Sequence, residues 1–253
     1  MNRFKSFWYP LLLVIILSAS TQVARAQEKE SKVKLDISAD FMSRYIWRGL
    51  NLGGSSPSIQ PGMDLTIGNF AVGAWGAYSF SHAITRQEAD LYASYTIADL
   101  FNIAVTDYYL PYEDTLNKYF NYKKDQTGHL FELSAKFLGT EKLPLSLLVA
   151  TNVYGADAVR ENGDIQYSTY LELGYSFTVA ETPCSAYLGF TPTKPDTDKG
   201  ETGYYGEGPG IINLGVTATK EIKITDKYSL PVNASLITNP QAENIFLVFG
   251  ISF

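Results

Sequence analysis

Apolar and polar residues alternate one by one along most of this chain, and this period of two constrains the fold more than any other feature. Between residues 33 and 41 the apolar positions are Val33, Leu35, Ile37, Ala39 and Phe41. A β-strand sends successive side chains to opposite faces, so each such segment has one apolar and one polar face. The same alternation recurs at residues 63–67, 90–97, 131–137, 166–177 and 230–236. An all-β fold is therefore predicted.

The connections between the alternating segments differ in length in a regular way. Short turns fall at sites such as Gly68–Asn69 and Asp99–Leu100, whereas long polar segments span residues 111–128 and 193–209. Hairpins with short turns on one rim and long loops on the other are typical of up-and-down barrels. We expect residues 33–253 to form a single antiparallel transmembrane β-barrel of about 12 strands.

The first 26 residues have the pattern of a secretory signal peptide. Arg3 and Lys5 precede an apolar run from Leu11 to Leu17, and the segment ends in small residues around Ala26. The apolar run is too short to cross about 30 Å of hydrocarbon as a helix. We predict cleavage after residue 26, a short segment at 27–32, and the barrel from residue 33.

Composition excludes several classes of protein. With 14% aromatic residues and 45% hydrophobic residues the chain is not intrinsically disordered, and a mean hydropathy of -0.06 excludes a bundle of membrane helices. Two histidines and one cysteine leave no disulfide framework and no Cys/His zinc site. A formal net charge of -6 argues against nucleic-acid binding.

The polar faces of the alternating segments carry many charges, which a dry core would not accommodate. A water-filled lumen would, so the apolar faces are predicted to contact lipid and the polar faces to line a pore. The predicted lining residues are Asp36, Asp40, Arg44, Arg48, Asp64, Trp75, Glu88, Asp90, Glu132, Lys136 and Glu172.

Aromatic residues fall where two membrane interfaces would lie. Three phenylalanines follow short turns or end the chain and are predicted to lie on one rim: Phe70, Phe101 and Phe253. The opposite girdle is predicted to contain Tyr45, Trp47, Tyr78 and Tyr109. Pro61 and Asp107 fall on the apolar face, which predicts a register shift or bulge near each.

A family resemblance is carried by the first strands. The segments Ser43–Leu50, Pro57–Gln60, Gly73–Gly76 and Glu88–Tyr92 resemble the TorF family of porins. This resemblance implies an outer-membrane barrel with a pore-like role, and it supplies no catalytic residues. The last strand likewise resembles the terminal strand that outer-membrane assembly machinery recognises. Its signal positions would be Leu247, Phe249, Ile251 and Phe253.

Several hypotheses concern the predicted lumen. Arg44 and Arg48 are predicted to lie on the inward face of the first strand, where they meet Glu88 and Asp90. These charges would narrow the channel, or they would form structural pairs that hold the wall in shape. Acids outnumber bases among the lining residues, so a mild preference for cations is expected. Trp75 could stack on a sugar ring or fill space, and the aromatic loop at 111–128 could fold inward or remain an outer loop.

Enzyme functions have little support in the sequence. His82 lies near Ser79, Ser81 and Glu88, but no nucleophile-elbow motif surrounds them. His129 is expected to be a solvated rim residue, and the adjacent acids Glu113 and Asp114 are weak evidence for a cation site. We predict that the protein is not an enzyme and needs no cofactor.

Together these patterns predict a porin in the outer membrane of a Gram-negative bacterium, which would allow passive diffusion of small hydrophilic solutes through a narrow charged lumen. Its expected partners are membrane lipid, the assembly machinery and the solutes. A non-conducting structural or adhesion barrel is the main alternative, and an outer-membrane hydrolase is a weaker one.

Overall fold

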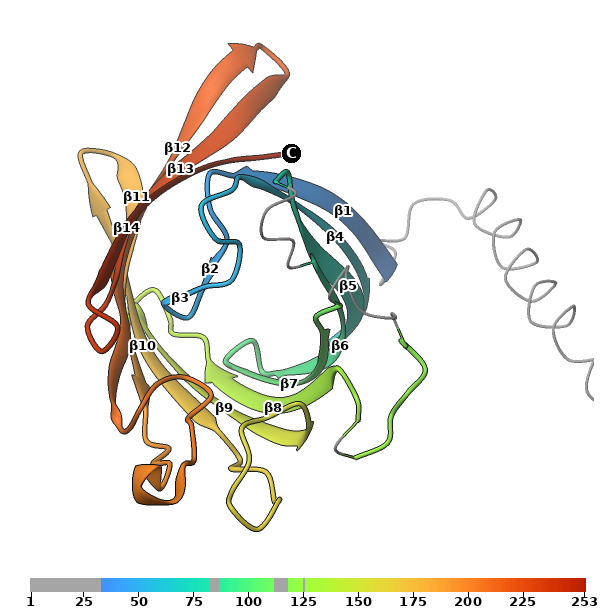
Figure 1. The fold of residues 1–253 in the computed structure, drawn as a ribbon. Helices are drawn as coiled ribbons and strands as arrows, with labels where there is room; N and C mark the ends of the chain where they lie inside the picture. Colours follow the sequence, from blue (N-terminus) through green and yellow to red (C-terminus); the bar gives the residue numbers. More distant parts are fainter. Residues whose placement is uncertain (1–32, 82–86, 112–117, 125) are drawn as a thin grey trace, which may run out of the picture. The chain divides into compact units, whose positions relative to one another are not determined.

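The computed structural model describes residues 33–81, 87–111, 118–124 and 126–253, and the unit Lys34–Phe253 is a closed antiparallel β-barrel (Figure 1). The predicted all-β, 12-strand architecture is confirmed. The wall strands are β1 Val33–Met42, β4 Ser58–Ile67, β5 Phe70–Ser79, β6 Gln87–Ile97, β7 Phe101–Tyr109, β8 His129–Phe137, β9 Leu145–Gly155, β10 Thr169–Val179, β11 Thr182–Thr191, β12 Gly210–Thr225, β13 Tyr228–Asn239 and β14 Asn244–Ser252.

Each wall strand from β4 to β14 pairs with its neighbours in the chain, and the ends of the sheet meet to close the barrel. β1 pairs with β14, with Phe41 opposite Ile251. Within the described ranges, no helix is long and apolar enough to cross a membrane. The only helix described is a single 3-10 turn, η2 (Thr197–Lys199), in the loop before β12.

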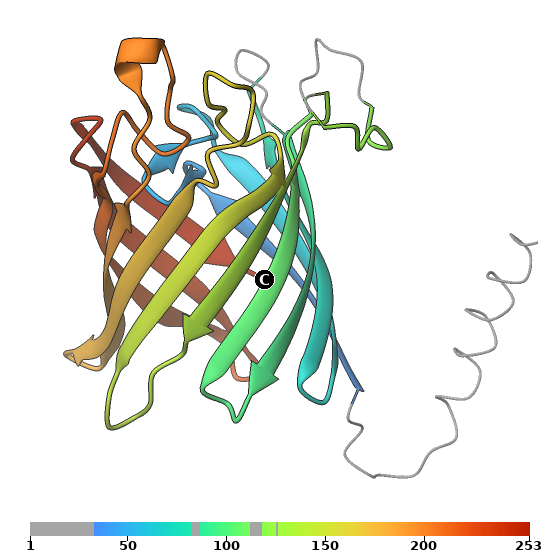
Figure 2. The same cartoon turned by 90° about the horizontal axis from the view of Figure 1, so that it is seen from below.

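Short turns join the strands at one end of the barrel, and the longer loops lie at the other (Figure 2). Two of the short turns place consecutive residues at positive φ: Ala98 and Asp99 between β6 and β7, and Ala180 and Glu181 between β10 and β11. The first of these turns has three residues, 98–100, and the second has two. Left-handed turn residues of this kind match the twist of antiparallel strands, so they fix the register of each hairpin.

The apolar side of the strands faces outward. On β10 the outward residues Leu173 and Tyr175 are 49% and 47% exposed, while the inward Tyr170 is fully buried. The same holds around the barrel, where exposed apolar residues include Leu35, Ile37, Met63, Leu91, Ile103, Leu133, Leu147, Leu214, Leu236 and Leu247. We call this continuous surface the outer apolar face. Most charged residues of the same strands point the other way, and Asp107 on β7 is an exception.

Of the two predicted aromatic girdles, the structure reproduces part of one. Phe70 and Phe101 are exposed at the rim with the short turns, whereas Phe253 lies beside the middle of β1, where its backbone pairs with Ala39. The opposite girdle is largely wrong: Tyr45 and Trp47 leave the wall with the segment after β1, and Tyr109 is covered by other aromatic rings. Tyr78 alone of the four predicted residues is exposed on the outer face.

The predicted irregularities are placed differently. β4 keeps one register with β5 on both sides of Pro61, so the expected shift there is absent. Next to Asp107, β7 and β8 also stay in register, but β8 and β9 shift between Phe131 and Glu132. The bulge therefore lies one strand away from the acid that suggested it.

Tyrosine rings cover glycines on the inner wall. Gly215 lies opposite Tyr187, and a Cβ atom added to it would overlap the Tyr187 ring. Gly73 is covered in the same way by Tyr92. The missing side chain makes room for the ring, which then stabilises the strand pair.

We predict that Gly215→Val destabilises the barrel by about 1 to 3 kcal/mol, because the new methyl groups displace the Tyr187 ring. Equilibrium urea unfolding, followed by the mobility of the folded form on gels, measures the effect. Gly208→Val is the control, since nothing lies within 4 Å of a Cβ at that position. Equal stability of the two variants would contradict this packing role.

Candidate functional site: a hairpin inside the barrel

The segment between β1 and β4 forms a small hairpin that lies inside the ring of wall strands (Figure 1). Its strands are β2 (Ile46–Trp47) and β3 (Leu50–Asn51), with Trp47 opposite Leu50. The two turn residues, Arg48 and Gly49, have φ of 51° and 78°. This pair of left-handed residues is the backbone pattern of a tight two-residue hairpin.

Gly49 brings the hairpin tip against the far wall. A Cβ atom at this position would overlap the carbonyl oxygen of Ile212 on β12. The Gly49 carbonyl accepts a hydrogen bond of 3.4 Å from Asn239 Nδ2 on β13. Position 49 therefore needs glycine for two reasons: its positive φ in the turn and the close approach of its backbone to Ile212.

Arg48 anchors the tip to β8. Its guanidinium donates to both carboxylate oxygens of Glu132, at 2.5 and 2.9 Å. It also donates to Tyr205 Oη at 2.6 Å, and Tyr108 donates to the same carboxylate at 3.2 Å. The Arg48 and Glu132 side chains are only 10% and 2% exposed. A buried bidentate pair of this kind holds its partners in one geometry.

Aromatic rings surround the Arg48 guanidinium. Its carbon lies 4.4 Å from the centre of the Trp47 ring and 4.6 Å from that of Tyr170. Trp47 also stacks on Tyr205 at 6.0 Å. Cation–π attraction of this type is strongest where water is excluded.

These contacts belong to one packed group, which we call the inner cluster. It joins the hairpin to β9, β10, β12 and the loop before β12. Its buried members are Ala150, Tyr170, Tyr205 and Ile212, against which Trp47, Leu50, Leu148 and Tyr204 pack. The inner cluster fills one side of the space enclosed by the wall.

Two loops are tied together above the inner cluster. Arg160 donates to Glu201 Oε2 at 3.0 Å, and the backbone N–H groups of Asp196 and Glu161 donate to the same carboxylate. These backbone donors, followed by Arg160, lower the pKa of Glu201. The carboxylate therefore stays charged. Its hydrogen bonds hold the loop that carries Tyr205 in place, so that Tyr205 remains in contact with Arg48.

A second group lies on the opposite wall. Tyr45, just before the hairpin, packs on Trp75 with ring centres 5.4 Å apart. Glu88 and Asp90, both on β6, are buried close by. Burial, and then the nearby Glu88 carboxylate, raise the pKa of Tyr45 well above its usual value. Tyr45 thus remains neutral and seals this side of the hairpin.

Most of the residues predicted to line a pore sit on the inward side of wall strands. Two of them are bonded to neighbours there: Asp64 accepts from Tyr92 Oη at 2.5 Å, and Glu172 accepts from Tyr170 Oη and Asn213 Nδ2. Asp36 pairs with Lys34 at 2.8 Å. The inward strand residues are Asp36, Asp40, Asp64, Trp75, Glu88, Asp90, Glu132, Lys136 and Glu172.

The prediction that placed Arg44 and Arg48 on the first strand is wrong, because β1 ends at Met42. Arg44 instead donates to the carbonyl of Gly54 at 3.3 Å, within the same segment. Arg48 is carried across to Glu132 by the hairpin. A signal for this was present in the sequence, since Arg48–Gly49 stands between the apolar pair at 46–47 and the apolar Leu50.

His129 is also placed differently from the prediction. It is completely buried, and its Nδ1 lies 2.8 Å from Asp107 Oδ1. Its Nε2 lies 2.5 Å from the carbonyl oxygen of Tyr119, and its ring stacks on Tyr122. The described part of the loop between β7 and β8 thus covers the outer side of these strands. Of the two alternatives for this loop, the described residues follow the outer one and not the inward one.

Several sequence predictions lie outside the described residues. These are the signal peptide at 1–26, the segment at 27–32, His82, and the acids Glu113 and Asp114. In the part of the chain that the structure describes, no three His, Cys, Asp or Glu residues gather to hold a metal ion.

Glu132→Gln keeps the size of the side chain and removes its charge, which leaves Arg48 buried without a counter-ion. We predict that the hairpin is destabilised by about 3 to 5 kcal/mol. Amide hydrogen exchange of residues 46–51 should accelerate accordingly. Asp164→Asn, which breaks the exposed pair with Lys124, is the control and should leave this exchange unchanged. Unchanged exchange in Glu132→Gln would refute the anchor.

Comparison with known proteins gives a family and a distant structural likeness. A solved structure described as "KdgM porin" is 9% identical in sequence, covers 86% of this chain and 97% of its own, and has a TM-score of 0.45. No curated protein matches the chain. Residues 26–229 match a family described as "Bacterial protein of unknown function (Gcw_chp)". Because this match spans most of the chain, the protein belongs to the Gcw_chp family.

Proposed function

We propose that this protein is an outer-membrane porin through which small hydrophilic solutes diffuse passively along a narrow, charged lumen. One observation carries the proposal: the closed wall has apolar side chains outside and charged side chains inside. A soluble barrel of this size would reverse the two faces. The apolar outer face and the charged inner face are both solvated only if hydrocarbon surrounds the barrel and water fills it.

A membrane location explains the exposure of the outer apolar face. Residues such as Ile37, Leu247 and Phe249, which are 75%, 57% and 54% exposed, would be unfavourable in water but are solvated by acyl chains. The resemblance to TorF-family porins and the signal-like first 26 residues favour the outer membrane. The terminal positions Leu247, Phe249, Ile251 and Phe253 would then serve recognition by the assembly machinery.

Between the hairpin tip and the end with the short turns, the lumen offers a polar path. Hydroxyl groups form a row across β10 to β13, with Ser176, Ser185, Thr217 and Ser235 paired strand by strand. Three of them line a cavity of about 410 Å³ toward the end with the short turns. Side chains of this kind replace part of the hydration shell of a small polar solute.

The hairpin sets the width of the path. Its tip crosses from β1 to β8 and β12, so solutes must pass beside the inner cluster. Among the charged lining residues that are not buried, acids such as Asp36, Asp64 and Glu172 outnumber the bases, and Arg48 is neutralised by Glu132. We therefore expect a small conductance and a mild preference for cations.

A non-conducting structural barrel is a second candidate, favoured by the close packing of the inner cluster. Tyr170 and Ile212 are fully buried inside the barrel, as in a plugged channel. The hairpin variants described below distinguish the two. Neither function requires catalysis, so we propose that the protein is not an enzyme.

The membrane orientation of the wall is tested by paired arginine substitutions on β10. Leu173→Arg puts a charge on the outer apolar face near the middle of the strand and should cost about 2 to 4 kcal/mol of stability in phospholipid vesicles. Ser176→Arg puts the same charge into the lumen and should cost much less. Reversible denaturant unfolding in vesicles measures both, and a larger cost for Ser176→Arg would overturn the assignment of the two faces.

Planar-bilayer recording tests the pore and its constriction. Wild-type protein should conduct weakly, with a reversal potential in a salt gradient that indicates cation preference. Arg48→Ala should raise conductance several-fold, because the hairpin tip loses its anchor. Lys124→Ala, which breaks an exposed loop pair, is the matched control.

Each other outcome has a definite meaning. If Arg48→Ala conducts like the wild type, the hairpin does not set the width. If neither protein conducts although insertion is verified, the pore proposal fails and the structural barrel is favoured. A reversal potential that indicates anion preference would refute the proposed role of the acids.

A further inference from the structure

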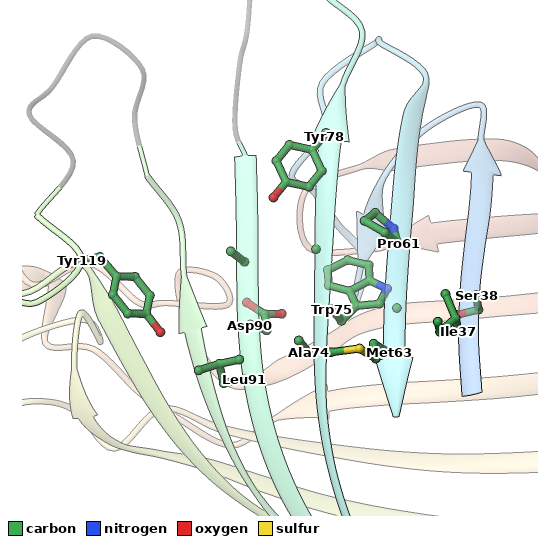
Figure 3. A pocket seen from close by; sticks show the side chains of 13 residues that line it. Ile37, Ser38, Pro61, Met63, Ala74, Trp75, Tyr78, Asp90, Leu91 and Tyr119 are labelled. Carbon is green, nitrogen blue, oxygen red and sulfur yellow. The ribbon is translucent and has the colours of Figure 1, made fainter. Parts of the chain in front are cut away.

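The outer apolar face contains a groove of about 400 Å³ over β4, β5 and β6. Figure 3 shows Met63, Ala74 and Leu91 along one edge and Tyr78 above them. Tyr119, from the loop after β7, closes one end. The groove is thus open to the surroundings of the barrel and lined mainly by apolar side chains.

Three small outward residues, aligned across adjacent strands, create the groove. Gly76 lies at the level of Pro61 on β4 and opposite Ala89 on β6. The rows on either side hold the larger side chains of Tyr78 and Leu91. A strip of small residues between bulkier rows leaves a recess, and the Tyr78 ring borders it at Gly76.

The wall of the groove at Tyr119 is held firmly. The Tyr119 carbonyl accepts a hydrogen bond from His129 Nε2, and its ring meets Tyr109 edge-on at 5.1 Å. The two ring nitrogens of His129 therefore each have an acceptor: the Tyr119 carbonyl at Nε2 and the Asp107 carboxylate at Nδ1. This buried pair joins the loop to β7 and β8, so the end of the groove is formed before any ligand arrives.

The surroundings of the groove identify its occupant. Ile37, Met63 and Leu91 at its edges are 75%, 49% and 50% exposed and are continuous with the outer apolar face. Two exposed lysines, Lys118 and Lys123, stand in the loop beside Tyr119. Apolar side chains along the groove, with two exposed lysines in the loop that closes its end, match a lipid whose headgroup is anionic.

We propose that this groove binds one acyl chain of an anionic membrane lipid, with Lys118 and Lys123 on the headgroup. The proposal rests on the membrane location given above, but not on conduction. A second barrel would present a broad strand face, which does not enter a recess of about 400 Å³.

The test uses the full-length folded protein in detergent, titrated with phosphatidylglycerol or phosphatidylcholine and followed by native mass spectrometry. Wild-type protein should retain phosphatidylglycerol in preference to phosphatidylcholine. Ala89→Phe fills the recess with an apolar ring and should weaken retention about tenfold. Ala135→Phe makes the same change on the outer face of β8, away from the groove, and should bind like the wild type.

The double variant Lys118→Gln/Lys123→Gln should lose the preference for phosphatidylglycerol while still binding lipid. The proposal is overturned if Ala89→Phe retains lipid like Ala135→Phe, or if Ala89→Phe instead abolishes a dimer of the wild type. Failure of wild-type protein to enter vesicles would reject the membrane location itself. Loss of conduction with normal lipid binding would reject only the pore.

Discussion

Every wall strand has N–H and C=O groups along both edges, and the structure depends on pairing all of them within one chain. In hydrocarbon an unpaired edge has no water to satisfy it, so a sheet can cross a membrane only when it closes on itself. Pairing of β1 with β14, with Phe41 opposite Ile251, removes the last edge. Closure fixes which face looks outward, and with it the apolar exterior and the charged interior.

Closure also creates an interior that must be filled or hydrated. Inward tyrosines fill part of it by lying over glycines, as Tyr187 does over Gly215. The hairpin fills more, because the Arg48–Glu132 pair and the rings of Trp47 and Tyr170 hold its tip against the far wall. What remains open is bordered by hydroxyl and carboxylate groups, which suit water and small solutes.

A buried pair of one basic and one acidic residue holds a segment on each side of the wall. Inside, Arg48 and Glu132 draw a segment into the lumen; outside, His129 and Asp107 draw a loop onto the outer face. Each is a buried charged or hydrogen-bonded pair surrounded by aromatic rings. The first narrows the proposed solute path, and the second shapes the groove where we propose that a lipid binds. A pair that excludes water can thus position a loop on either face of one sheet.

Alternation of side chains determined the strand number, the up-and-down order and the two faces of the wall, because a period of two is a local property that each segment carries by itself. It also placed residues such as Asp64, Glu132 and Glu172 on the inward side. Tertiary structure alone decided their partners. Arg48 reaches Glu132 because β1 ends at Met42 and the next residues turn inward, and His129 is buried because a loop folds over it. Contacts between residues 84 or 22 positions apart depend on closure and on the path of loops, and no local pattern encodes either.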